Sequence, residues 1–214
     1  MSQIALIDYG SGNVRSVSRA LAAAAGSLGG TTLITLTDDP DVIRKADRIV
    51  LPGVGHFADC ASGLRGRPGV VDAMTDAVRE RGAPFLGVCV GMQLLADVGR
   101  EDGDTEGLGW IPGSVEPLAP DDPQLPIPHM GWNELSIDHE HAVFSGLGAS
   151  PHVYFTHSYV FSPGSAADVA ASFSYGGNFA AAVARDNVVG TQFHPEKSQA
   201  VGIRLLANFL SWSP

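Results

Sequence analysis

The sequence is poor in cysteine, in aromatic residues and in positive charge, and it has no long hydrophobic run. Two cysteines, Cys60 and Cys89, cannot build a disulfide framework, and they suit a reducing compartment such as the cytoplasm. Only 13 Lys and Arg stand against 23 Asp and Glu, a net charge of −10, which argues against nonspecific binding to nucleic acid or to an anionic membrane. No apolar run approaches the roughly 20 residues of a membrane helix. The N-terminus lacks the basic and apolar regions of a signal peptide.

The composition and length favour one globular domain over residues 1–214. The hydrophobic fraction is 44% and the charged fraction 17%, which are ordinary values. In the first half, apolar runs alternate with amphipathic segments: strands are predicted at 3–8, 31–36, 48–51 and 84–88, and helices at 14–25, 39–46, 56–64 and 70–81. This alternation predicts an α/β fold with a mostly parallel central sheet flanked by helices.

The second half of the chain changes character. Residues 99–128 are rich in glycine, proline and acids, which predicts loops and short antiparallel strands. Further strands are predicted at 134–137, 153–161, 169–175, 179–185 and 188–193, before a final helix at 199–212. We interpret this half as a mixed, antiparallel extension of the same sheet.

Three segments follow predicted strands and are expected to meet at one edge of the sheet: 8–13, 52–55 and Cys89. Ligands bind outside the carboxyl ends of the strands in such sheets. The glycine-rich segment 9–13 suggests a phosphate loop, but its spacing matches neither the dinucleotide-binding pattern nor the P-loop. We therefore expect no nucleotide site there.

The segment 84–95 reads PFLGVCVGMQLL and predicts a short strand, an abrupt turn and a helix that starts near Cys89. Glycines at 87 and 91 bracket the cysteine, which is the thiol version of the nucleophile elbow. A β-carbon at either glycine would crowd the strand against the helix. A thiol at a helix N-terminus is stabilised as thiolate. From this segment alone, a buried cysteine that serves as a small core residue fits equally well.

A candidate base lies far along the chain, in the segment HPE at 194–196. A thiol nucleophile needs a group that takes its proton and returns it to the leaving group, and histidine does both near neutral pH. Glu196 is two residues from His194, so its carboxylate can reach the ring and fix its tautomer. Alone, the two residues are better explained as an exposed loop pair. The elbow at the same predicted edge favours a catalytic pair.

Acyl transfer also needs donors for an oxyanion. The segment Pro52-Gly53-Val54-Gly55 is suited to present backbone amides, and the amide of Val90 follows the nucleophile. A simple turn is the alternative for the glycine-containing segment.

Taken together, these residues resemble a known family. GVCVGMQ, HSY and QFHPEKS resemble the class I (triad) glutamine amidotransferases. DYGSGN, PGVGHF, TEGLGWIPG, HMGWN and YFTHSY are similar to the glutaminase subunits of imidazole glycerol phosphate synthase within that family. The motifs span nearly the whole chain in the family's order.

The resemblance implies hydrolysis of glutamine to glutamate and ammonia, without a metal or cofactor. Cys89 would form a γ-glutamyl thioester, His194 would act as acid and base, and Glu196 would orient His194. Gly53 and Val54 would belong to an oxyanion strand that in this family is able to reorient before catalysis, with Val90 completing the oxyanion site. The residues that would bind the glutamine are Gly55, Gln93, His157, Ser158 and Tyr159.

The resemblance also implies a partner, a (β/α)₈-barrel cyclase subunit in a heterodimer. Ammonia would pass through the barrel and attack a ribonucleotide, giving imidazole glycerol phosphate and aminoimidazole carboxamide ribonucleotide in histidine biosynthesis. Residues at the cyclase interface would be Asn13, Trp132, Tyr154 and Lys197. The alternatives are a glutaminase of another pathway, a free-standing γ-glutamyl hydrolase, and a regulatory subunit that has lost catalysis. The intact triad argues against the last.

Several other residues are expected to be structural or solvent-exposed. His56 stands where the family has a small residue; it could bring a titratable group near the oxyanion strand, but a side chain that points to solvent is the preferred interpretation. Val90 replaces a more usual leucine without affecting the amide. Cys60 is expected to be structural. His139 and His141 could bind a metal, but a solvated loop is the favoured interpretation.

Overall fold

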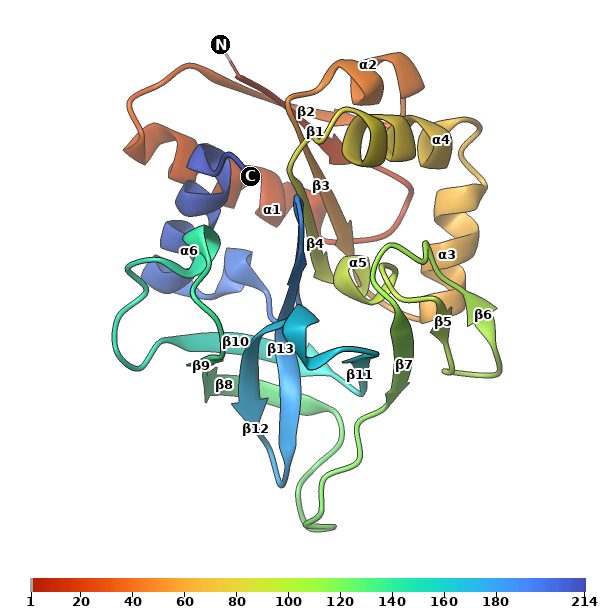
Figure 1. Ribbon diagram of the computed structural model, residues 1–214, viewed down its shortest axis with the longest axis vertical. Coiled ribbons are helices and arrows are strands. Elements are labelled where there is room, and N and C mark those ends of the chain that lie inside the picture. Colours follow the sequence, from red (N-terminus) through yellow and green to blue (C-terminus); the bar gives the residue numbers. More distant parts are fainter. Residues whose placement is uncertain (1) are drawn as a thin grey trace.

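The computed structural model describes residues 2–214 and shows an α/β fold built on one large sheet (Figure 1). Within this part of the chain the sheet has the order β2-β1-β3-β4-β14-β13-β12-β9. The strands from β2 to β14 are parallel to their neighbours, and those from β14 to β9 are antiparallel. Their bounds are β2 Thr32–Thr37, β1 Ser2–Ile7, β3 Arg48–Gly53, β4 Phe85–Cys89, β14 Val188–Thr191, β13 Asn178–Arg185, β12 Val169–Ser174 and β9 Ser136–Ile137.

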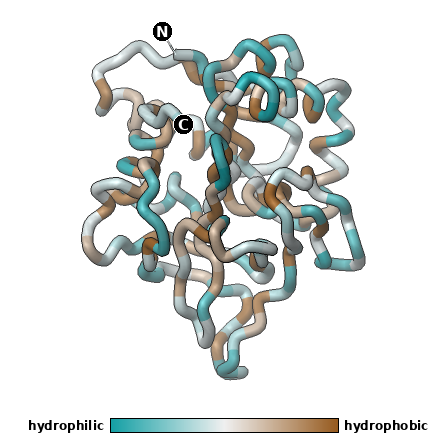
Figure 2. The backbone as a smooth tube through the Cα atoms, viewed as in Figure 1, coloured by the Kyte–Doolittle hydropathy of each residue, from teal (hydrophilic) through white to brown (hydrophobic). Residues whose placement is uncertain are grey.

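Helices cover both faces of the parallel part. On one side lie α1 (Val14–Ser27) and α6 (Gln199–Ser211); on the other lie α2 (Pro40–Lys45), α3 (Phe57–Arg65), α4 (Val70–Thr75) and α5 (Val90–Gln93) (Figure 1). Strands covered on both faces are apolar throughout, and every residue of β4 is buried. Figure 2 shows the hydrophobic residues concentrated along these central strands. The α/β prediction is confirmed.

Six strands form two small sheets beside the antiparallel extension that was predicted for the central sheet. One sheet pairs β8 (His129–Glu134) with β10 (His152–His157). The other has the order β11-β7-β5-β6, with bounds β11 Tyr159–Pro163, β7 Gly113–Pro117, β5 Val98–Gly99 and β6 Thr105–Glu106. Only β9, β12, β13 and β14 extend the central sheet as predicted.

The predicted strand 153–161 is in fact two strands. It stops after His157 and resumes at Tyr159 in a different sheet, with Ser158 between them. The break falls in the polar stretch 156–158, between two groups of strand-forming residues at 153–155 and 159–161. The predicted strand 134–137 is divided between the end of β8 and β9, and the polar motif HMGWN itself forms most of β8.

Helix ends follow local sequence signals. Asp39 caps α2 by accepting a hydrogen bond from the Asp41 amide (2.9 Å), with Pro40 in the first turn as predicted. The predicted helix 70–81 continues past α4 as a π-helix turn, η1 (Asp76–Glu80). Pro52 does not end β3, which runs through Gly53. Short 3₁₀ turns are η2 (Ala142–Phe144), η3 (Ala166–Asp168) and η4 (Pro195–Lys197).

One hydrophobic core connects both halves of the chain, from Leu6 and Leu86 in the parallel strands to Phe155 and Phe193 in the second half. None of the helices within residues 2–214 combines the length and the hydropathy that crossing a membrane requires.

Candidate active site

Cys89 occupies the sharp turn between β4 and α5. Its backbone has φ 56° and ψ −114°, a region that non-glycine residues rarely adopt and that marks strained functional positions. The turn depends on close backbone approach: a β-carbon on Gly87 would collide with the Gly91 carbonyl, and one on Gly91 with the Leu51 carbonyl. The elbow predicted from the glycine spacing is therefore present, although α5 is only one turn long.

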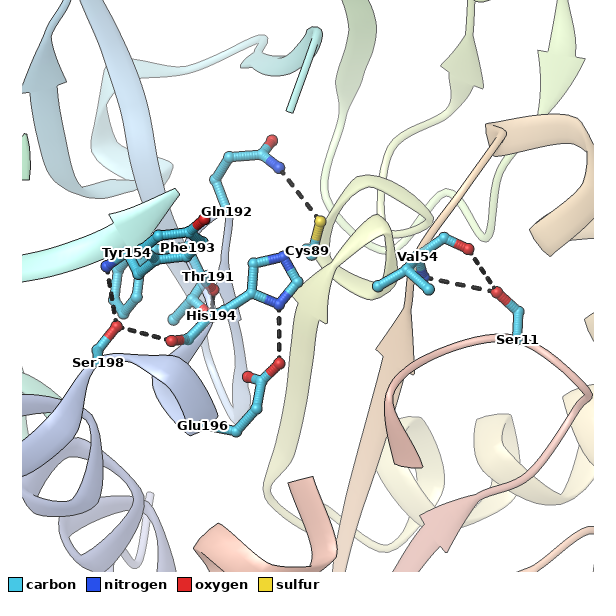
Figure 3. Close-up of polar contacts among 10 residues, drawn as sticks. All are labelled: Ser11, Val54, Cys89, Tyr154, Thr191, Gln192, Phe193, His194, Glu196 and Ser198. Atoms are coloured by element: carbon cyan, nitrogen blue, oxygen red, sulfur yellow. Dashed lines mark hydrogen bonds and ion pairs between the residues drawn. The ribbon is translucent and has the colours of Figure 1, made fainter. Parts of the chain in front are cut away.

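His194 lies directly beyond the strand next to β4. β14 pairs with β4 in parallel, so the chain leaving β14 reaches the same edge of the sheet as Cys89. The Nδ1 atom of His194 lies 2.8 Å from Oε1 of Glu196, and the two side chains are 1% and 2% exposed. Figure 3 shows the imidazole between the Cys89 sulfur and the Glu196 carboxylate. Within the described part of the chain, Nε2 of His194 has no hydrogen-bond partner, so it is available to a reacting proton.

The backbone of His194 is held on both sides. Its amide donates to the Tyr154 carbonyl (3.0 Å), and the Ser198 hydroxyl donates to its carbonyl (2.6 Å). The Ser198 hydroxyl also accepts from the Tyr154 amide (3.0 Å) (Figure 3). Strand β10 therefore fixes the position of the histidine.

The surroundings of His194 favour its protonated form. Burial alone lowers the pKa of an imidazole, but the neighbouring Cys89 sulfur and Glu196 carboxylate outweigh burial and raise the pKa of His194 to about 9. The imidazolium is thus available to protonate a leaving group, and its positive charge stabilises a nearby thiolate.

The segment around Val54 lies beside the nucleophile. Gly53 is opposite Cys89 in the β3–β4 register, and the amide of Val90 follows the nucleophile at the start of α5. The Ser11 hydroxyl makes two hydrogen bonds with the backbone of Val54. It donates to the Val54 carbonyl (2.7 Å), and it accepts a long hydrogen bond from the Val54 amide (3.5 Å). In this state the Val54 amide is directed at Ser11 (Figure 3).

A pocket of about 530 Å³ opens in front of Cys89. All five residues predicted to bind the substrate line it: Gly55, Gln93, His157, Ser158 and Tyr159. Gln93 is fixed by donating to the Tyr159 carbonyl (3.1 Å) and to Oε1 of Gln192 (3.0 Å). The volume suits a small polar molecule.

Several residues at the site were missed from the sequence. Gln192 has its Nε2 3.9 Å from the Cys89 sulfur, and Glu101, Pro128 and Thr156 line the pocket. Gln192 lies two residues before His194, just beyond the end of β14, so a shared side of the extended chain was the available signal. Glu101 lies in a glycine-rich loop that gives no periodic signal.

Two of the four predicted interface residues line the pocket, and the other two are connected to Lys197 through ring contacts. Asn13 and Lys197 line the pocket, and Nζ of Lys197 is 5.6 Å from the centre of the Tyr154 ring. Trp132 packs edge-on against Tyr154 at 6.0 Å and is 47% exposed. Met130, which was not predicted, is 62% exposed on the same face of β8.

His56 is partly exposed, and its Nε2 lies 2.9 Å from a carboxylate oxygen of the exposed Asp102. Cys60 is buried, and its sulfur contacts Ser11 (3.2 Å) and the Val54 carbonyl (3.5 Å). No group of metal-ligating side chains was found within residues 2–214. His141 is half-buried and accepts from the Val143 amide at the start of η2, so only the neighbouring His139 is solvated.

A buried thiol on an elbow, a histidine–glutamate pair and an adjacent amide-bearing loop are arranged for acyl transfer through a thioester. Residues 5–212 match the glutamine amidotransferase class-I family, and the chain belongs to it. It is a glutamine amidotransferase enzyme.

Two full-length relatives narrow the resemblance further. The chain is 55% identical over 214 residues to the imidazole glycerol phosphate synthase subunit HisH of Caulobacter vibrioides, covering 100% of both chains. It is 54% identical over 213 residues to the subunit of the same name from Rhodospirillum rubrum, covering 99% of this chain and 100% of the relative.

Solved structures support the same fold. A glutamine amidotransferase crystal structure superposes with a TM-score of 0.71 at 22% identity, covering 97% of each chain. A glutamine amidotransferase from Thermotoga maritima superposes with a TM-score of 0.58 at 16% identity, covering 91% of this chain and 76% of that one. At these identities the likeness concerns the fold alone.

Proposed function

We propose that this protein is the glutaminase subunit of an imidazole glycerol phosphate synthase, which hydrolyses glutamine and supplies ammonia to a cyclase. The observation that carries the proposal is full-length identity of 50–55% to proteins named as this subunit. The buried Cys89–His194–Glu196 arrangement at a pocket of suitable size supports it.

The reaction steps follow from the geometry. The Cys89 sulfur attacks the carboxamide carbon of glutamine, and the negative charge that develops on the oxygen is stabilised by backbone amides. The Val90 amide is already at the elbow, and amides of the Gly53–Val54 segment would complete the site. His194 protonates the departing nitrogen, so that ammonia leaves and a γ-glutamyl thioester remains.

The thioester is hydrolysed in the second half of the reaction. His194, now neutral, accepts a proton from water, and the hydroxide attacks the thioester carbonyl. Glutamate is released and the Cys89 sulfur leaves as thiolate. Glu196 holds the ring through Nδ1 in both halves, so that Nε2 always faces the reacting atoms.

The proposed partner is a (β/α)₈-barrel cyclase that forms a heterodimer with this chain and completes a lyase reaction with the ammonia. Exposed Met130 and Trp132, with Tyr154 and Lys197 beside the pocket, supply the aromatic and cationic side chains that interfaces favour. The contact between Ser11 and the Val54 amide fits a resting enzyme, because that amide is turned to Ser11 until the partner acts. We further propose one domain over residues 1–214 and, since Cys89 must stay a free thiol, a cytoplasmic location.

The test is glutamate release from glutamine, measured for the chain alone and with a cyclase subunit that holds its nucleotide ligand. We expect negligible release alone and a large increase in the complex. Fast, equal release in both would instead identify a free-standing γ-glutamyl hydrolase. A matched pair of variants tests the site: Cys89→Ala should abolish release and keep cyclase binding, whereas Cys60→Ala should retain release.

A further inference from the structure

Two histidines outside the catalytic triad are buried side by side behind the pocket. His129 on β8 is 4% exposed and His157 on β10 is 7% exposed, and they are direct partners in the antiparallel register. Nδ1 of His129 lies 3.1 Å from Nε2 of His157. The triad chemistry uses neither side chain.

The hydrogen bonds determine which ring nitrogen of each of the two histidines carries the hydrogen. Nδ1 of His157 is 2.9 Å from the Tyr159 carbonyl, which only accepts, so this nitrogen must carry the hydrogen. Neutral His157 therefore accepts at Nε2, and His129 must donate from Nδ1. That leaves Nε2 of His129 as an acceptor facing the Asn133 amide nitrogen at 3.4 Å.

Asn133 also has a fixed orientation. Its carbonyl oxygen accepts from the Glu134 amide (2.8 Å), and its amide nitrogen donates to the Ser174 carbonyl (2.9 Å). Around the imidazole of His129 pack the rings of Phe155, Phe173 and Tyr175, with centroids 4.1–5.1 Å away. This aromatic cage leaves the ring little freedom to rotate, and burial lowers the pKa of both histidines to about 4, so that they are neutral.

The hydrogen bonds that start at His129 and pass through His157 end at residues 157–159, which line the pocket. The bond from His157 to the Tyr159 carbonyl closes a tight turn around Ser158, at the break between β10 and β11. Gln93 donates to the same carbonyl from the other side. The Tyr159 carbonyl is thus held by two buried side chains, and the orientation of the turn depends on both.

We propose that His129 is a positioning residue for substrate binding: its Nδ1–H orients His157, which holds the turn at Ser158 against the pocket. This rests on the proposed function and on the expectation from the family resemblance that His157, Ser158 and Tyr159 bind the glutamine. Strand β8 has two faces, since Met130 and Trp132 on its outer face are exposed while His129 and Asn133 face inward. The strand proposed to meet the cyclase therefore also carries the residue that sets the glutamine site.

Two variants at position 129 separate the hydrogen bond from the packing. His129→Phe fills the aromatic cage but removes the donor. His129→Asn loses the ring but places an amide nitrogen near the former Nδ1. If His129 only packs, the phenylalanine variant should be the better enzyme; if it positions His157, the asparagine variant should be.

The first readout is the Michaelis constant for glutamine in the complex with a liganded cyclase. We expect His129→Phe to raise KM about tenfold, the effect of one lost buried hydrogen bond, with kcat changed less than twofold. His129→Asn should recover most of the KM despite a lower melting temperature. An unchanged KM in the phenylalanine variant, or an asparagine variant that is no better, would overturn the proposal.

The second readout needs no cyclase, so it tests the cluster even if the proposed partner is wrong. Cys89 is alkylated either with iodoacetamide or with a glutamine analogue that carries a diazoketone in place of the carboxamide. The rate constant for the glutamine analogue, divided by that for iodoacetamide, reports recognition of the amino-acid head. We expect this ratio to fall about tenfold in His129→Phe with the iodoacetamide rate unchanged. Equal ratios in variant and wild type would contradict the proposal.

A third measurement requires no variant and covers the case in which both variants fail to fold. Nitrogen-15 spectra of the histidine rings in the full chain report the tautomer of each imidazole. We expect both His129 and His157 with hydrogen on Nδ1. A hydrogen on Nε2 of either ring would break the chain of donors and overturn the proposal.

Discussion

The hydroxyl of Ser11 lies 2.7 Å from the Val54 carbonyl oxygen and also accepts from the Val54 amide. Ser11 belongs to the loop after β1, and Val54 to the loop after β3, so the contact ties two neighbouring loops at the edge of the sheet. Since the Val54 amide is engaged here, it is not free to stabilise an oxyanion in front of Cys89.

Removal of this hydroxyl should make the isolated subunit more active. In Ser11→Ala the Val54 residue loses two hydrogen bonds that hold it in the resting state, worth about 1 kcal/mol each. We expect glutamate release by the chain without cyclase to rise at least about fivefold, the factor for about 1 kcal/mol. Ser211→Ala is the control, because that hydroxyl contacts only its own helix. Unaltered basal release would show that Ser11 does not restrain the site.

Glu196→Gln should shift the pH dependence of catalysis. The carboxylate contributes to the raised pKa of His194, which is about 9, so its removal should lower that pKa. The imidazolium acid should then be lost at lower pH, and the alkaline limb of the kcat/KM profile should move from near 9 toward neutrality. The profile is measured in the complex with liganded cyclase. A limb at the same pH in enzyme and variant would exclude the His194–Glu196 pair as its origin.

Acid should destabilise the fold through the two buried histidines. The pKa of His129 and of His157 is about 4, below the ordinary value of 6.5, chiefly because of burial. As pH falls from 6.5 to 4, the unfolded chain binds protons that the folded chain does not, so stability is lost over this window.

His129→Phe isolates one of these two contributions. The wild type should lose up to about 2 kcal/mol more than the variant between pH 7.5 and 5, since one pKa unit corresponds to about 1.4 kcal/mol. Urea unfolding at both pH values measures the difference. Parallel losses in the two proteins would mean that His129 titrates normally.

Lys197→Ala should weaken coupling to the cyclase more than folding. Lys197 is exposed and its ammonium group lies over the ring of the half-buried Tyr154, so a loss of this contact should have little effect on the core. We expect the stimulation of glutamate release by the liganded cyclase to fall about tenfold, as for loss of one charged interface contact. Lys45→Ala, at the far end of α2, is the matched control. Full stimulation in Lys197→Ala would remove this residue from the coupling.

The parts of the site that follow from local rules were predictable from the sequence. The close strand-to-helix turn at Cys89 requires glycine on either side, and the spacing of His194 and Glu196 lets the carboxylate reach the ring. The parallel strands of the first half follow from alternating apolar runs.

Features set by tertiary packing were not predictable. In β8 the apolar Met130 and Trp132 face outward while the polar His129 is buried, the reverse of the usual pattern. The split at Ser158 lies in the polar stretch 156–158 between strand-forming residues, and no glycine or proline marks it as a turn. The contact of His56 with Asp102 joins residues 46 positions apart and depends on how two loops meet.

The order of strands has a consequence for synthesis of the protein. β4, which carries Cys89, lies beside β14, and β14 is separated from it by about half of the chain. While the chain is still being made, the thiol has neither its base nor the neighbouring strand that closes the sheet. Nascent and prematurely terminated chains that lack β14 are therefore unable to release ammonia, and glutamine is spared until the last strand has taken its place.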